Sequence, residues 1–127
     1  MVAKSLKNEG LYPSDVIKWE EEDRYSREVL TIAPSETIVI GQVLEKFSGG
    51  YGAVKTAGNA KAIALSAVTT GSGETMDIVC LVREAKVITD NLSYGQLNKA
   101  EVMAALKTVG IISSDAPTDT NPIIDEV

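Results

Sequence analysis

The sequence contains no histidine and only one cysteine, Cys80. Without histidine, the commonest general base and the commonest zinc ligand are both missing. A single cysteine excludes an internal disulfide and every cysteine-cluster metal site, and its position inside an apolar run favours a buried structural thiol. We therefore expect no enzymatic activity, no bound metal and no cofactor.

Basic residues and long apolar runs are also scarce. The 12 Lys and Arg residues are outnumbered by 18 Asp and Glu, which gives a net charge of −6. This excess of acid argues against nucleic acid and against an anionic membrane as partners, because both require positive charge. No apolar run approaches the ~18 residues that span a bilayer, and no apolar stretch of a secretory signal is visible near the N-terminus. We expect synthesis in a cytoplasm.

At 127 residues the chain is long enough for one domain with its own core, and its pattern divides it into three zones. Residues 1–26 are polar, with an acidic run from Glu20 to Asp23 and few apolar residues, which predicts an extended N-terminal arm. Residues 27–112 form the predicted β-rich domain. Residues 113–127 carry two prolines, four acidic residues and no basic residue, which predicts a polar acidic tail.

The middle zone predicts short strands separated by Gly-rich turns. We expect strands at 28–33, 37–40, 42–47, 51–56, 61–68, 77–83 and 85–89, with a bend near Arg83 and Glu84. The segment 77–83 is the strongest of these, because five of its seven residues are apolar. Burial on both of its faces would place Val79 and Leu81 in the core. Such spacing of strands is typical of a small barrel or sandwich.

One helix is predicted near the end of the domain. Asn98 is a candidate N-cap with Glu101 three residues later, and Gly110 would end the helix. Apolar residues recur between them at helical spacing, at Val102, Ala105, Leu106 and Val109. Ile111–Ile112 would form a short edge strand. The predicted fold is therefore mainly β (small α+β), a compact barrel-like or sandwich-like domain with one packed helix and an extended N-terminal arm.

Two local clusters resemble ligand sites without meeting their requirements. The four adjacent acids from Glu20 to Asp23 lack the alternate spacing and the glycine of a calcium loop, so a solvated charge run is the better interpretation. Residues 48–52 are Gly-rich, but a phosphate cradle needs a following helix N-terminus, whereas a strand is expected here.

Several short motifs, taken in order, resemble the bacteriophage lambda-type head decoration proteins, the protein D family. Tyr25-Ser26-Arg27-Glu28 leads into the Val/Ile strand at 29–32, and a Gly-x-Val-Leu step follows at 41–44. The segment KAIALSAVTTGSG resembles a strand of that family, DIVCLVREAKVI resembles its valine-rich strand followed by Arg-x-Ala-x-Val, and the helix ends in a Leu-x-x-x-Gly-Ile step. The resemblance covers residues 25–112.

The resemblance implies a capsid decoration, or cementing, protein whose partners are the major capsid protein and further copies of itself. Such a protein would bind the outer surface of the expanded head as a homotrimer at three-fold and quasi-three-fold positions. It would stabilise the shell against DNA pressure through many weak contacts that act together. The composition agrees with this role, since an acidic protein suits the outside of the shell better than contact with DNA.

The predicted capsid contacts lie in the N-terminal arm. We expect this arm to be mobile in the free protein and to order on the capsid, because isolated apolar residues cannot offset its ordering entropy. Val16, Ile17 and Trp19 would fill pockets while the arm adds a strand to a partner's sheet edge. Tyr25 and Arg27 would sit at the hinge where the arm leaves the domain. The alternative that Trp19 folds back onto its own domain stays open.

Two other classes of protein were weighed against this interpretation. A small β-barrel carrier domain of the biotinyl or lipoyl type is the alternative, but it needs a lysine at a hairpin tip, and residues 74–77 read Glu-Thr-Met-Asp. An enzyme that uses carboxylates alone, as glycosidases do, needs a deep cleft in a larger scaffold. A biotin or lipoate adduct in the mass of the protein would favour the carrier domain.

Overall fold

The computed structural model describes residues 11–114 of the chain. Its helices are α2 (Pro13–Val16), α3 (Asp23–Ser26) and α4 (Lys99–Lys107), with 3-10 turns at Ala57–Asn59 and Thr89–Asn91. Its strands are β1 (Ile17–Glu20), β2 (Arg27–Ile32), β3 (Thr37–Ile38), β4 (Val43–Phe47), β5 (Gly50–Ala53), β6 (Ala62–Ala64), β7 (Val68–Thr69), β8 (Met76–Leu81), β9 (Ala85–Val87) and β10 (Ile111–Ser113).

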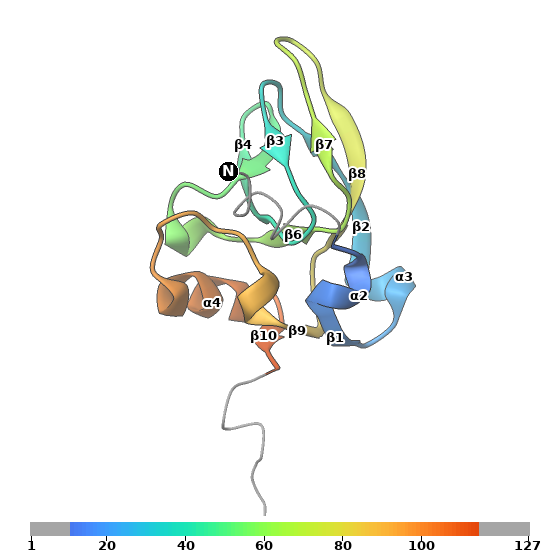
Figure 1. Ribbon diagram of the computed structural model, residues 1–127, viewed down its shortest axis with the longest axis vertical. Helices are drawn as coiled ribbons and strands as arrows, with labels where there is room; N and C mark the ends of the chain where they lie inside the picture. The colour runs from blue at the N-terminus through green and yellow to red at the C-terminus, as the bar shows by residue number, and fades with distance from the viewer. Residues whose placement is uncertain (1–10, 115–127) are drawn as a thin grey trace, which may run out of the picture.

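The strands form a closed barrel and two smaller sheets (Figure 1). The barrel runs in the order β2-β5-β4-β6-β8, and its longest ladder is the antiparallel pairing of β2 with β8. A three-stranded sheet in the order β1-β9-β10 stands beside it, and β3 pairs with β7. The prediction of a mainly β, barrel-like domain with one packed helix is therefore confirmed.

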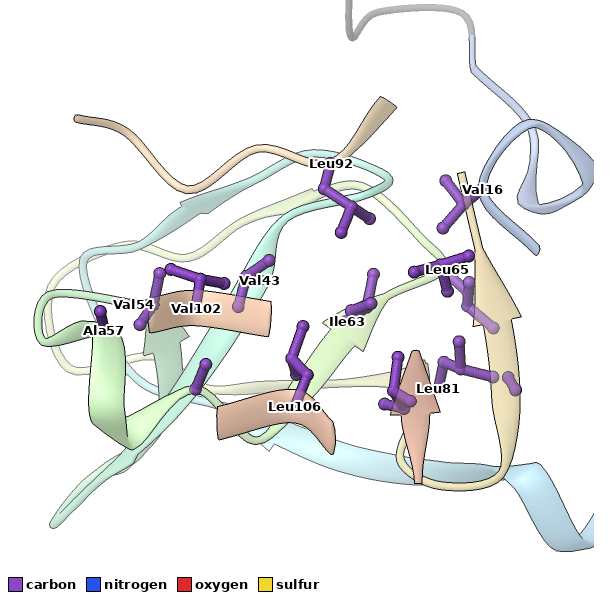
Figure 2. Packing of buried hydrophobic residues seen from close by; sticks show 14 residues of the cluster. Val16, Val43, Val54, Ala57, Ile63, Leu65, Leu81, Leu92, Val102 and Leu106 are labelled. Atoms are coloured by element: carbon purple, nitrogen blue, oxygen red, sulfur yellow. The ribbon is translucent and has the colours of Figure 1, made fainter. Parts of the chain in front are cut away.

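The molecule has two hydrophobic cores that share the barrel wall. The inner core fills the barrel and contains Ile32, Ile38, Leu44, Ala62, Ala64, Ile78 and Cys80. The outer core lies between the barrel, α4 and the three-stranded sheet, and Figure 2 shows Val102 and Leu106 of α4 beside Val43 and Ile63 of the wall. Side chains alternate along a strand, so neighbours such as Val43 and Leu44 enter different cores. The wall strands β4, β6 and β8 are for this reason apolar on both faces.

The prediction for the strongest strand was right for Leu81 and wrong for Val79. Leu81 is fully buried in the outer core, whereas Val79 is 38% exposed. The two residues point to the same side of β8, but the outer core covers that side only at Leu81. Val79 lies one pleat further along, opposite the exposed Val29 of β2.

The predicted helix and its edge strand are confirmed. The side chain of Asn98 caps α4, since its Oδ1 accepts a hydrogen bond from the backbone N–H of Glu101 at 3.0 Å. The chain leaves the helix through Gly110, whose φ of +86° favours glycine. Strand β10 then pairs in parallel with β9 at the edge of the three-stranded sheet.

Four predicted strands are shorter or interrupted, and of these β5 ends at Ala53 and β9 at Val87. The segment 61–68 does not form one strand, because a bend separates β6 from β7. β6 enters the barrel, and β7 pairs instead with β3. Only Thr37–Ile38 of the expected strand at 37–40 is extended in a sheet. The alanines and the polar residues of these segments gave weak strand signals.

The prediction of an extended N-terminal arm is wrong for residues 11–26. These residues form α2, β1 and α3, and β1 pairs antiparallel with β9, from Ile17 opposite Val87 to Glu20 opposite Ala85. Val16 is fully buried in the outer core. The segment does not need a core of its own, because it contributes to the core of the domain. Residues 1–10, the rest of the predicted arm, lie outside the described residues.

The predicted acidic tail lies almost entirely outside the described residues. Its first residue, Ser113, ends β10, and the backbone N–H of Ser114 donates to the carbonyl oxygen of Val87 at 2.9 Å. The sheet therefore extends one residue beyond the predicted end of the domain at 112.

Candidate functional site

The described residues offer little for catalysis. Cys80 is buried in the barrel, and this burial raises the pKa of its thiol to about 12. Within residues 11–114 there is no group of three or more acidic or cysteine side chains placed to hold a metal ion. Over the same range, no helix has the length and apolar character required to cross a bilayer. The candidate contact residues are the apolar side chains exposed at the surface.

Large apolar side chains are exposed in two places on that surface. The first is the segment 11–26, where Tyr12 is 70%, Trp19 48% and Tyr25 49% exposed. The second is the β2–β8 ribbon, where Val29 and Val79 lie opposite each other on the outer face and Met76 lies on the other face at the start of β8. Exposed aromatic side chains are typical anchors of protein interfaces.

The five residues predicted to bind a partner differ in their exposure to solvent. Val16 is fully buried and is not available at the surface, which corrects the prediction that it fills a partner's pocket. Ile17 packs partly against the outer core. Trp19 and Tyr25 remain exposed, and Arg27 is partly buried.

Arg27 joins β2 to β1 at the position predicted to be a hinge. Its guanidinium donates two hydrogen bonds to Glu20, from Nη2 to Oε1 at 2.7 Å and from Nε to Oε2 at 3.2 Å. These bonds raise the pKa of Arg27, while partial burial acts in the opposite direction. A two-point ion pair of this kind fixes geometry, so Arg27 holds the segment onto the domain.

Arg83 holds Tyr25 in place in a similar way. Its guanidinium donates to the backbone carbonyl of Tyr25 and pairs with the carboxylate of Glu28. It also lies over the ring of Tyr25, 5.1 Å from the centroid. Sequence reasoning did not assign this role to Arg83. The only available signal was a lone arginine between an apolar strand and a bend.

Two open hollows flank these anchored side chains. One is lined by Glu21, Glu22, Tyr25 and Glu84. The other is lined by Asp23, Arg24, Arg27, Glu28, Val29 and Val79. We call the first the tyrosine hollow and the second the valine hollow. Both are shallow and charged at the rim, as expected of surfaces that contact another macromolecule.

The fold and this surface define the class: a small β-barrel protein with exposed apolar side chains on its surface. A family model described as bacteriophage lambda head decoration protein D matches residues 6–111. The match spans most of the 127 residues, and the chain therefore belongs to the head decoration protein family. No curated protein and no solved structure gave a significant match.

Family membership confirms the resemblance that the sequence motifs indicated, and the match extends further toward the N-terminus than residue 25. The family is a structural one, so the protein is a component of the phage head that decorates the capsid.

Proposed function

We propose that the protein cements the expanded phage head from outside, as a homotrimer at the three-fold and quasi-three-fold positions of the shell. It would connect neighbouring subunits of the major capsid protein and resist the pressure of packaged DNA. The observation that carries this proposal is the match of residues 6–111 to the head decoration family.

The physical character of the chain supports the outer location. A net charge of −6 is repelled by DNA inside the shell. Two cores that share one barrel wall make a compact body, which can transmit force between subunits with little deformation. We further propose that the protein has no enzymatic activity, since its single thiol is buried and it has no histidine.

We propose that Trp19 and Tyr12 provide the main capsid contacts, with Ile17 beside them. Trp19 lies on β1, an edge strand of its sheet, so a capsid segment could approach both its ring and the backbone of the edge. Val16 is excluded from this set by its burial. Arg27 acts indirectly, because its bonds to Glu20 keep β1 in position.

Trp19→Ala tests the proposed capsid contact. Because about half of this ring is exposed, the fold should tolerate the change, whereas affinity for empty expanded heads should fall about tenfold or more, equivalent to about 1.4 kcal/mol. The matched control is Met76→Ala, which removes another half-exposed apolar side chain at the far end of β8. Binding would be measured by sedimentation of heads with bound protein. Equal affinity of the Trp19→Ala and wild-type proteins would exclude Trp19 as a contact.

A further inference from the structure

The valine hollow contains an apolar sheet face that nothing in the described chain covers. Val29 of β2 and Val79 of β8 lie opposite each other on this face, 62% and 38% exposed. Leu81, on the same side of β8, is buried in the outer core. The exposed Val29–Val79 face therefore continues the buried face of the same strands. Two arginines and two carboxylates line its rim: Asp23, Arg24, Arg27 and Glu28.

The positive charge at this rim is only partly used within the protomer. Arg27 is paired with Glu20. Arg24 is exposed and makes no ion pair within residues 11–114. The valine hollow thus combines an apolar floor with two arginines and two carboxylates, of which Arg24 and Asp23 make no ion pair within residues 11–114.

The tyrosine hollow is the more acidic of the two. The exposed ring of Tyr25 is the large apolar group in it, and three carboxylates accompany it, those of Glu21, Glu22 and Glu84. None of these carboxylates has an ion pair within the described part of the chain. The guanidinium of Arg83 contacts both the ring and the backbone carbonyl of Tyr25. The side chain of Tyr25 is therefore fixed in position before a partner binds.

We propose that these two hollows form the contact between neighbouring protomers of the trimer, an inference that rests on the proposed homotrimer. Tyr25 of one protomer docks on the Val29–Val79 face of the next, and the carboxylates beside Tyr25 face Arg24 of that neighbour. The helix α3 contributes to both hollows, through Asp23 and Arg24 on one and Tyr25 on the other.

A ring assembly is the arrangement that the proposed homotrimer requires. Two unlike surfaces on one protomer can pair with each other either across a two-fold axis, where each contact is made twice, or head-to-tail. The two-fold pairing stops at a dimer, whereas head-to-tail contacts close into a ring when the rotation permits. A tyrosine that docks into an apolar pocket of its partner is also a common interface hot spot.

Cross-linking between two single-cysteine additions tests the contact directly. One variant carries Glu22→Cys in the tyrosine hollow, and the other carries Val29→Cys in the valine hollow. Cys80 stays silent, because it is buried and its thiol pKa is raised to about 12. Empty heads are decorated with an equal mixture of the two variants and treated with a short bifunctional maleimide. We expect covalent dimers of the decoration protein from the mixture and none from heads decorated with either variant alone.

Charge reversal provides a second, independent readout. Arg24→Glu would place like charges across the contact and should weaken trimer formation about tenfold or more. Adding Glu22→Arg to the same chain should restore assembly, because the pair of charges is exchanged. Glu22 gives α3 no side-chain cap, so its replacement leaves the helix intact. The control is Lys99→Glu, the same change of charge on the exposed start of α4.

The outcomes separate this inference from the proposed function. Trimer density on heads without mixed-variant dimers, and without an effect of Arg24→Glu, would overturn the assigned interface and leave the trimer in place. Links from either cysteine to the major capsid protein would show that the capsid occupies the hollow, which also overturns it. Heads decorated by single, unassociated protomers would overturn the trimer itself.

Discussion

Val79 and Leu81 show how two residues on one strand and one side can differ in role. Leu81 belongs to the outer core, together with residues of α4 and the three-stranded sheet. These elements do not extend over Val79, which is exposed. A strand sequence reveals which residues share a face, but not how far along that face another element extends.

Truncating these two residues should therefore have unequal effects on stability. Leu81→Ala removes a fully buried side chain and should lower the free energy of unfolding by about 2 to 4 kcal/mol. Val79→Ala, on the same strand, should change it by less than about 1 kcal/mol. Urea unfolding of the two variants measures the difference. Equal losses would mean that Val79 is buried in the protomer.

Glu45 is a buried carboxylate with a structural task. It is 7% exposed and accepts hydrogen bonds from the backbone N–H groups of Lys55 and Thr56, at 3.0 and 3.2 Å, and from the side-chain amide of Asn59 at 3.0 Å. Burial alone would raise the pKa of Glu45, but these bonds outweigh it and hold the pKa below the ordinary glutamate value.

Because the pKa of Glu45 is lowered in the folded protein, its contribution to stability depends on pH. The bonds stabilise the fold fully above the ordinary glutamate pKa of about 4.3, and the contribution is lost as the pH falls through the lower folded-state value. Glu45→Gln should reduce stability at neutral pH by about 1 to 3 kcal/mol. The gap between variant and wild type should narrow toward acid pH. The exposed Glu22→Gln is the control. A gap that stays constant down to strongly acid pH would contradict the assigned role.

At the scale of elements, β1 connects the N-terminal segment to the domain. Besides its pairing with β9, the backbone N–H of Ile88 donates to the carbonyl of Val16 at 2.8 Å, and the side chain of Asn91 donates to the carbonyl of Asp15 at 2.7 Å. The segment is therefore part of the folded unit and not a detachable arm.

Deletion of residues 2–22 should destabilise the fold. It removes Val16 from the outer core and β1 from its sheet, and we expect the melting temperature to fall by about 10 °C or more. Thermal unfolding followed by circular dichroism measures this. Trp19→Ala is the control that leaves the segment in place. An unchanged melting temperature after the deletion would support the original idea of an independent arm.

The elements that sequence reasoning found are those specified by local chemistry. Helix α4 is fixed by its Asn98 cap and by apolar residues at helical spacing, all within one short segment. The pairing of Ile17 with Val87 depends instead on residues far apart in the chain, and four residues with one exposed tryptophan carry no clear strand signal. The aromatic residues Trp19 and Tyr25 were predicted as contacts by residue type, and both are exposed in the structure. Their division between surfaces, the role of Arg83 and the burial of Val16 depend on tertiary packing.

On the scale of the whole molecule, the protein is an acidic barrel that exposes aromatic and valine side chains suited to contact with other proteins. Trp19 and Tyr12 lie at the start of the described chain, and the two hollows share α3. In the proposed assembly, the first set contacts the capsid and the hollows connect the protomers. Separate surfaces would allow many weak contacts to act together around each three-fold position.

Electron microscopy of expanded heads, prepared with and without the protein, tests this account most directly. The account predicts additional density on the outer surface, in the form of trimers at the three-fold and quasi-three-fold positions, into which the barrel fits. Density that is absent from these positions, or that lies only inside the shell, would contradict it.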